Sequence, residues 1–171
     1  MAGAPRHERA LVRDAQRGSV SAIEALFRLH WPKLHRAAYL VVQDAAAAED
    51  IAQESFVAAV RRLETFDRDR PFGPWLHRIA VNRAIDWLRV RQLRAEAELE
   101  DAAAPLLAPE VSDDALAALA RLAPEHRAVI VLRHLLGYTP GEIAELLGLP
   151  RGTVNSRLRR GLDTLRERLP S

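Results

Sequence analysis

The 171-residue sequence contains no cysteine, which excludes disulfide bridges, thiolate metal ligands and catalytic thiols. It also lacks any apolar run near the roughly eighteen residues that a membrane-spanning helix needs, and its N-terminus lacks the apolar segment of a signal peptide. Only 5% of the residues are aromatic. We therefore expect a protein of one or two small domains in a reducing compartment, the cytoplasm, with no insertion into a membrane.

Motifs for catalysis and metal binding are absent as well. The sequence holds no GxxxxGK[ST] or GxGxxG phosphate loop, no HExxH and no Gly-x-Ser-x-Gly elbow. Its histidines do not pair at metal-ligand spacing, since His30 and His35 are separated by Pro32, and His126 and His134 are eight residues apart. These absences predict a protein that is not an enzyme and that uses no cofactor and no metal.

The charges that are present are unevenly distributed. Lysine is nearly missing, because 24 of the 25 basic residues are arginine. Residues 61–94 hold nine basic and four acidic side chains, whereas residues 95–120 hold seven acidic and no basic ones. Basic residues predominate again after residue 120. Two separate basic blocks favour a protein that binds a polyanion in two modules, although solvated helix faces would give a similar pattern.

Apolar residues return at three- and four-residue steps along most of the chain, which predicts an all-α fold. We expect two small helical domains, at residues 5–94 and 115–169, joined by an Ala-, Glu-, Asp- and Pro-rich linker at residues 95–114 whose first half continues the preceding helix. The predicted helices cover residues 21–42, 46–63, 71–93, 115–122, 124–136, 140–147 and 152–169. Pro32 is expected to break or kink the first of them, and Val57 is expected on an inward face with Ile51 and Phe56.

The last two predicted helices have the pattern of a helix-turn-helix motif. Thr139, Pro140 and Glu142 form a capping-box pattern, and Gly148 begins a tight turn before the final helix. The buried stripe of that helix leaves polar side chains for the major groove of duplex DNA. They are Arg151, Thr153, Asn155, Ser156, Arg157, Arg159 and Arg160. The alternative is an amphipathic helix with a solvated, Arg-rich face.

Four of the few aromatic residues, Phe66, Phe72, Trp75 and Trp87, lie within 22 residues and are interleaved with arginines. Aromatic faces beside arginines can stack unpaired bases and hold their backbone. Phe66 and Phe72 flank a short polar loop and are expected to be exposed, whereas Trp75 and Trp87 are expected in the core. Asn82 lies on the same helix, where its amide could contact a base.

A polar patch lies near the start of the helix predicted at residues 46–63. It contains Glu49, Asp50, Gln53 and Glu54. Acidic residues in a first turn can simply complement the helix dipole, or they can form a surface for a protein partner.

Three strings stand in order with regular gaps: AEDIAQESFVAAVRRL, FDRDRPFGPWLHRIAVNRAIDWLR and LAPEHRAVIVLRHLLGYTPGEIAELLGLPRGTVNSRLRRGLDTLRERL. With them the chain resembles, over about residues 8–169, the extracytoplasmic-function (ECF) group of the sigma-70 family. The resemblance implies a dissociable sigma factor that binds core RNA polymerase and directs promoter recognition, promoter melting and transcription initiation. It also implies that residues 5–94 are sigma domain 2, that residues 115–169 are sigma domain 4, and that an anti-sigma factor is a partner.

The resemblance also implies roles for single residues. Asp50, Gln53 and Glu54 would contact core polymerase. The separated strand of the −10 element would lie at Phe66, Phe72, Trp75, Asn82, Asp86 and Arg89. The duplex −35 element would be read or held by Arg151, Thr153, Asn155, Ser156, Arg157, Arg159 and Arg160. The acidic linker would thread the polymerase near the RNA exit path.

Three positions depart from the family pattern. Asn155 stands where Lys or Arg is common, Pro150 replaces a frequent Ser cap, and Arg159 replaces an apolar or aromatic residue of some relatives. The −35 preference is therefore expected to differ. A helix-turn-helix regulator that binds duplex DNA alone, or an adaptor that binds only protein, are the alternative functions.

Overall fold

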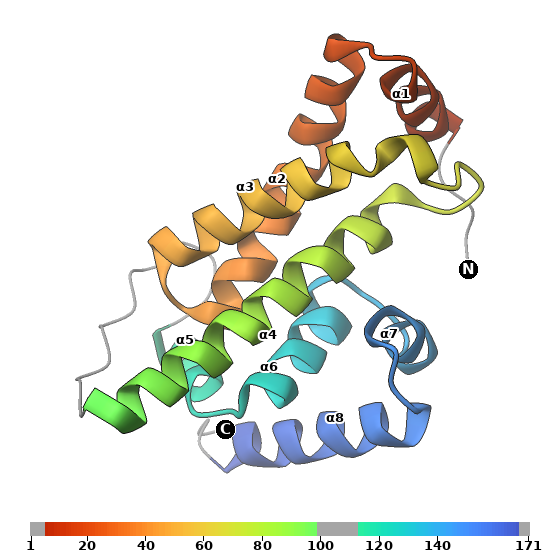
Figure 1. Ribbon diagram of the computed structural model, residues 1–171. Coiled ribbons are helices and arrows are strands. Elements are labelled where there is room, and N and C mark those ends of the chain that lie inside the picture. Colours follow the sequence, from red (N-terminus) through yellow and green to blue (C-terminus); the bar gives the residue numbers. More distant parts are fainter. Residues whose placement is uncertain (1–5, 99–112, 168–171) are drawn as a thin grey trace.

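A computed structural model describes residues 6–98 and 113–167. Every regular element in these two ranges is a helix, which confirms the all-α prediction (Figure 1). We call residues 6–98 the N-terminal unit and residues 113–167 the C-terminal unit. Part of the predicted linker, residues 99–112, and the last residues of the predicted final helix, 168–169, lie outside the described residues.

The N-terminal unit consists of α1 (Arg6–Gln16), α2 (Val20–Val42), α3 (Ala45–Arg61), the short 3-10 turn η1 (Leu63–Thr65) and α4 (Phe72–Glu98). Ser19 caps α2 by accepting a hydrogen bond from the backbone N–H of Ala22, and Asp44 caps α3 in the same way through Ala47. Helix α4 reaches Glu98, so the helix does continue into the predicted linker as expected. Helix α1 was not predicted from the sequence; its buried residues are Glu8, Val12 and Ala15.

Helix α2 runs through Pro32 without interruption, so the predicted break is wrong, and the kink that was the other expected outcome stays a prediction. Leu26 and Leu34, on the two sides of the proline, are both buried, while Pro32 itself is exposed. Helix α2 packs against both α3 and α4 along its length. Burial on both sides of Pro32 therefore offsets the cost of about 3 kcal/mol that an internal proline imposes on a helix.

The C-terminal unit consists of α5 (Asp113–Ala120), α6 (Pro124–Ile130), the π-helical turn η2 (Val131–Leu135), α7 (Pro140–Leu147) and α8 (Arg151–Arg166). The capping box is present, with Thr139 accepting from the Glu142 N–H and the Glu142 carboxylate accepting from the Thr139 N–H. Gly148 ends α7 at φ +64, a backbone conformation that favours glycine. The predicted helix-turn-helix motif is thus formed by α7 and α8.

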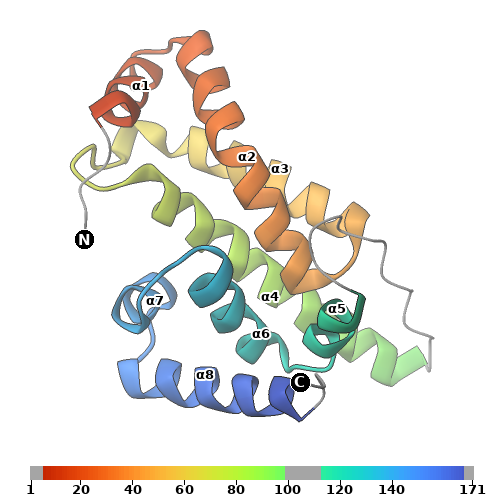
Figure 2. The same ribbon diagram turned by 180° about the vertical axis from the view of Figure 1, so that it is seen from behind.

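The two units pack against each other. Helix α4 lies between α2 and α3 on one side and α6 and α7 on the other (Figures 1 and 2). A single set of buried apolar side chains continues from the N-terminal unit into the C-terminal unit. Helix α8 lies on the side of the C-terminal unit that is remote from α2 and α3.

Candidate nucleic-acid and partner interfaces

Helix α8 presents the polar surface that its sequence predicts. Val154 and Leu158 are buried against the rest of the unit, which fixes the rotation of the helix. Four of the predicted DNA-contacting side chains are exposed: Arg151, Asn155, Arg159 and Arg160. The other three are partly buried: Thr153, Ser156 and Arg157. The exposed arginines and the asparagine have the donors and acceptors that base edges and phosphates require.

A hollow of about 460 Å³ separates part of α8 from the first turn of α6. Thr153, Ser156, Arg157 and Arg160 line it from α8, and Glu125 and His126 line it from α6. Burial lowers the pKa of His126, and the nearby Arg157 and Arg160 lower it further. This histidine is therefore kept neutral beside the arginines and adds no positive charge to the hollow.

Gly161 lets α8 approach α6 closely. A Cβ atom at this position would lie 3.1 Å from Cγ1 and 3.3 Å from Cδ1 of Ile130. The sequence reasoning did not single out Gly161, although a glycine inside a helix is a signal for close packing.

The expected exposure of the aromatic side chains is wrong for Phe66 and Phe72. Both are buried, with relative exposures of 8% and 1%, whereas Trp75 and Trp87 are only partly buried. Phe66 lies edge-on to Phe72 at 5.7 Å between ring centroids, and its ring lies 4.5 Å from that of Trp75. The two buried phenylalanines thus pack beneath Trp75. Of these three aromatic side chains, Trp75 is the one that reaches the surface.

Helix α1 explains this burial. Gln16 donates two hydrogen bonds of 2.9 Å from its Nε2 to the carbonyl oxygens of Leu63 and Phe66. At the other end of the loop, the backbone N–H of Phe72 donates to Oε1 of Glu8 at 2.9 Å. Helix α1 therefore fixes both ends of the 66–72 loop. Sequence periodicity cannot reveal such a contact, because its partners are about 50 to 64 residues apart.

A groove of about 730 Å³ lies beside Trp75, between the two units. Phe66, Trp75 and Arg78 contribute to its N-terminal wall, and Tyr138 and Glu142 contribute to its C-terminal wall. The candidate stacking surface is therefore faced by the turn that precedes α7.

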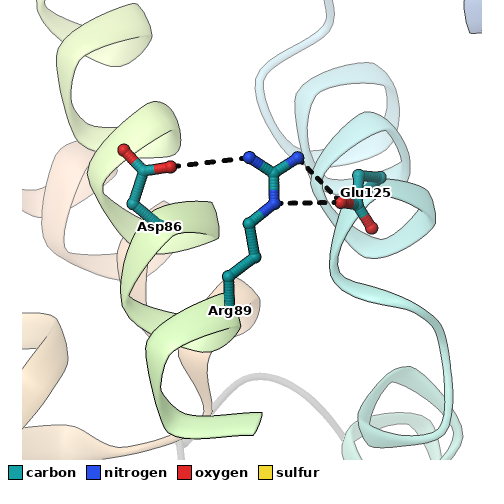
Figure 3. A network of polar contacts seen from close by, with 3 residues as sticks. All are labelled: Asp86, Arg89 and Glu125. Carbon is teal, nitrogen blue, oxygen red and sulfur yellow. Dashed lines mark hydrogen bonds and ion pairs between the residues drawn. The ribbon is translucent and has the colours of Figure 1, made fainter. Parts of the chain in front are cut away.

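Of the other predicted single-strand contacts, Asn82, Asp86 and Arg89 are exposed on α4. Figure 3 shows the Arg89 guanidinium between two carboxylates, with Asp86 at 3.6 Å on α4 and Glu125 at the start of α6. Nε and Nη2 of Arg89 donate to Oε1 of Glu125 at 3.2 and 2.9 Å. Burial acts to raise the pKa of Glu125, but the hydrogen bonds and charge of Arg89 bring that pKa below its ordinary value. Arg89, which is a predicted DNA contact, is thus bonded to the C-terminal unit.

The acidic patch on α3 is exposed, as a partner surface requires. Asp50, Gln53 and Glu54 all face solvent, and Glu54 accepts a 2.7 Å hydrogen bond from Arg83 of α4. Val57 continues the same stripe and is 47% exposed, so its predicted inward orientation is wrong. The inward positions are filled by its neighbour Phe56 and by Ile51, and Val57 is rotated about 100° from Phe56 around the helix.

Besides the pair of Arg89 and Glu125, three further polar contacts join the units, and none of them was predicted from the sequence. Nη1 of the buried Arg127 donates to the carbonyl oxygen of Val41, at the end of α2, at 2.6 Å. Gln43 donates to the carbonyl oxygen of Leu116 at 2.8 Å. His77 on α4 is hydrogen-bonded through Nδ1 to the hydroxyl of Tyr138 at 2.7 Å. Together they hold α5, α6 and the turn before α7 against the N-terminal unit.

Burial perturbs two of these groups. It lowers the pKa of Arg127 to about 10, which leaves the guanidinium charged at neutral pH. It also lowers the pKa of His77 to about 4, with smaller contributions from His30 and Lys33, so this imidazole is neutral at pH 7. Arg127 completes its contacts by donating from Nη2 to the carbonyl oxygens of Ala120 and Leu122.

Comparison with protein families identifies both units. The Sigma-70 region 2 family matches residues 26–94, and the Sigma-70, region 4 family matches residues 112–165. The chain is 31% identical to the ECF RNA polymerase sigma factor SigW of Bacillus subtilis, over 92% of this chain and 94% of SigW. It is 37% identical to the RNA polymerase sigma factor CarQ of Myxococcus xanthus, over 89% of this chain and 91% of CarQ. The chain belongs to the ECF sigma factors.

Solved structures of this family have the same fold. CnrH, in complex with the cytosolic domain of CnrY, superposes with a TM-score of 0.71 at 29% identity, over 94% of this chain and 95% of CnrH. The sigma factor RpoE of Bartonella quintana, in complex with the anti-sigma factor NepR, gives a TM-score of 0.74 at 24% identity, over 86% of this chain and 96% of RpoE. The two family matches and the sigma factors SigW and CarQ favour the role of a sigma factor over that of an independent helix-turn-helix regulator.

Two further observations concern the described residues only. None of their helices has the length and apolar character to cross a membrane. They also contain no group of three or more His, Cys, Asp or Glu side chains placed to hold a metal ion.

Proposed function

We propose that this sigma factor binds core RNA polymerase through the N-terminal unit and recognises promoters with both units, while carrying out no chemistry of its own. Residues 5–94 would bind the polymerase and the −10 element, residues 95–114 would form the linker, and residues 115–169 would bind the −35 element. The observation that carries the proposal is that one chain combines an exposed acidic stripe, an aromatic surface flanked by arginines, and a helix-turn-helix motif.

The polymerase contact is assigned to the stripe on α3. Asp50 lies one helical turn before the adjacent Gln53 and Glu54, and all three are exposed, so they can contact a helical partner together. Exposed carboxylates favour a basic partner surface.

The separated strand of the −10 element is assigned to the surface around Trp75. Trp75 is the partly exposed ring of the cluster, so it stacks a base directly. Phe66 and Phe72 support that ring from below. Asn82, Asp86 and Arg89 continue the surface along α4. Stacking stabilises bases that have left the duplex, which lowers the cost of melting.

The duplex −35 element is assigned to α8. Arg151, Asn155 and Arg159 lie one helical turn apart along the exposed face and are suited to base edges and phosphates. Thr153, Ser156, Arg157 and Arg160 lie beside the hollow at α6 and are suited to phosphates.

An anti-sigma factor is proposed as a second partner, because CnrH and RpoE, which share this fold, were solved with the cytosolic domain of CnrY and with the anti-sigma factor NepR. Because the proposed function requires RNA polymerase and chromosomal DNA, we propose that the protein acts in the cytoplasm.

Reconstituted transcription tests the proposal. Core RNA polymerase, with and without this protein, would transcribe a pool of genomic fragments, and the 5′ ends of the transcripts would be sequenced. We expect new start sites that share two upstream elements. If the protein binds duplex DNA but adds no start sites, it acts as a regulator instead.

A further inference from the structure

The first helix carries a row of arginines that the assignments above do not use. Arg6, Arg9 and Arg13 recur at three- and four-residue intervals, on the face of α1 opposite the buried Val12 and Ala15. All three are exposed. Across from them lies Arg68 in the 66–72 loop. The four arginines line a hollow of about 570 Å³.

Two acidic side chains, Asp67 and Asp69, also line the hollow, so its four arginines exceed its carboxylates by two. Asp67 accepts a hydrogen bond from the backbone N–H of Asp69 at 3.0 Å and lies 3.8 Å from the guanidinium of Arg70. Asp14 pairs with Arg13 at 3.4 Å. Among the described residues, no ion pair or hydrogen bond engages the side chains of Arg6, Arg9 and Arg68. The hollow therefore offers unpaired guanidinium groups.

The hollow adjoins the groove beside Trp75. Phe66 and Asp67 line both. The hydrogen bonds from Gln16 to Leu63 and Phe66, and from Phe72 to Glu8, hold α1 on the loop that separates the two depressions. The arginines of α1 are thus fixed in place relative to the aromatic surface, as a preorganised site requires.

We infer that α1 and Arg68 form a phosphate-binding site for the single DNA strand whose bases stack at Trp75. Guanidinium groups bind phosphate oxygens in a planar, bidentate manner, and grooves for single strands combine such a basic track with an aromatic platform. The inference rests on the proposed −10 assignment. It adds sequence-independent contacts to the DNA backbone, and the position of the hollow directly beside the aromatic groove favours a DNA strand over an acidic peptide as the occupant.

The test compares two DNA probes bound to holoenzyme. One is a fork, with duplex DNA upstream and only the non-template strand from the −10 element onward, built from a promoter found by start-site mapping. The other is the upstream duplex alone. For Arg6→Gln/Arg9→Gln we expect about tenfold weaker binding to the fork, a salt slope reduced by about 0.7 for each lost phosphate contact, and unchanged binding to the duplex.

Arg28→Gln/Arg121→Gln is the matched control, since both arginines are exposed and lie outside the hollow. It should bind both probes as the unchanged protein does. Equal losses on both probes, or no loss on the fork, would overturn the inference. A loss of affinity for core polymerase would assign the hollow to a protein partner and would overturn it as well.

The same experiment separates this inference from the function beneath it. If the unchanged holoenzyme does not prefer the fork over the duplex, the −10 assignment has failed, and the phosphate site fails with it. If that preference is present but the variant retains it in full, only the phosphate site is wrong.

Discussion

The two candidate DNA surfaces differ in how freely they are presented. In the C-terminal unit, Arg151, Asn155 and Arg159 are exposed on α8, a helix that lies remote from α2 and α3. In the N-terminal unit, Trp75 faces a groove whose other wall includes Tyr138, and Arg89 is bonded to Glu125. In this conformation a duplex can reach α8, whereas a single strand at Trp75 and Arg89 would compete with the C-terminal unit.

The largest effect is expected from removing Arg127, which joins the units. Arg127→Met leaves the buried carbonyl oxygens of Val41 and Leu122 without their charged donor. Unsatisfied buried acceptors cost about 1 to 3 kcal/mol each, so we expect a loss of about 3 kcal/mol in the free energy of unfolding. Urea denaturation measures it. Arg121→Met, at an exposed position, is the control and should change little.

The next effect is a dependence of stability on pH through His77, whose pKa is lowered mainly by its burial between the units. The pKa of His77 is about 4 in the folded protein and 6.5 as a free side chain, so unfolding takes up a proton at pH values between them. Stability is therefore greatest above pH 6.5 and falls as the pH decreases toward 4. Between pH 7.5 and pH 5 the expected loss from His77 is about 2 kcal/mol.

Urea denaturation of the unchanged protein and of His77→Gln, each at both pH values, isolates this contribution. The pKa values of His30 and His126 are also lowered, so a weaker dependence of the same sign should persist in the variant. Identical pH dependence of the two proteins would contradict the assignment to His77.

A smaller effect is expected at the exposed face of α8. Asn155→Lys replaces an amide suited to adenine by an ammonium suited to guanine. We expect a change of about 1 to 3 kcal/mol in discrimination at one base pair of the −35 element, measured by binding of holoenzyme to duplexes randomised there. Stability and binding to core polymerase should not change. A uniform loss on every sequence would mean that Asn155 contacts only the phosphate backbone.

The smallest effect is expected at the surface of Trp75 and Arg89, which faces the C-terminal unit. Glu125→Gln weakens the hold on Arg89 without changing the size of the side chain. The Arg89 side chain is 56% exposed, so the pair contributes about 1 kcal/mol or less, and we expect up to about fivefold tighter binding of the protein to a fork probe. Glu24→Gln, at an exposed position on α2 outside the groove, is the control. Tighter binding of both variants would reflect net charge alone.

Local features of the sequence were predicted well. The helical periodicity, the capping box at Thr139 and the buried stripe of Val154 and Leu158 depend on residues within one or two turns of each other. Errors appeared where distant segments meet. Phe66 and Phe72 flank a polar loop, and only the placement of α1 buries them; the burial of both sides of α2 overrides Pro32.

An all-α chain with a helix-turn-helix motif near its end could be predicted from the sequence alone. So could the acidic stripe on α3 and the sequence strings typical of a sigma factor, because each of these features depends on residue spacing within one segment. The tertiary structure alone decided which aromatic ring reaches the surface, that Arg89 binds Glu125, and that the arginines of α1 meet the 66–72 loop. These contacts join residues tens of positions apart, and their geometry is set by the packing of whole helices.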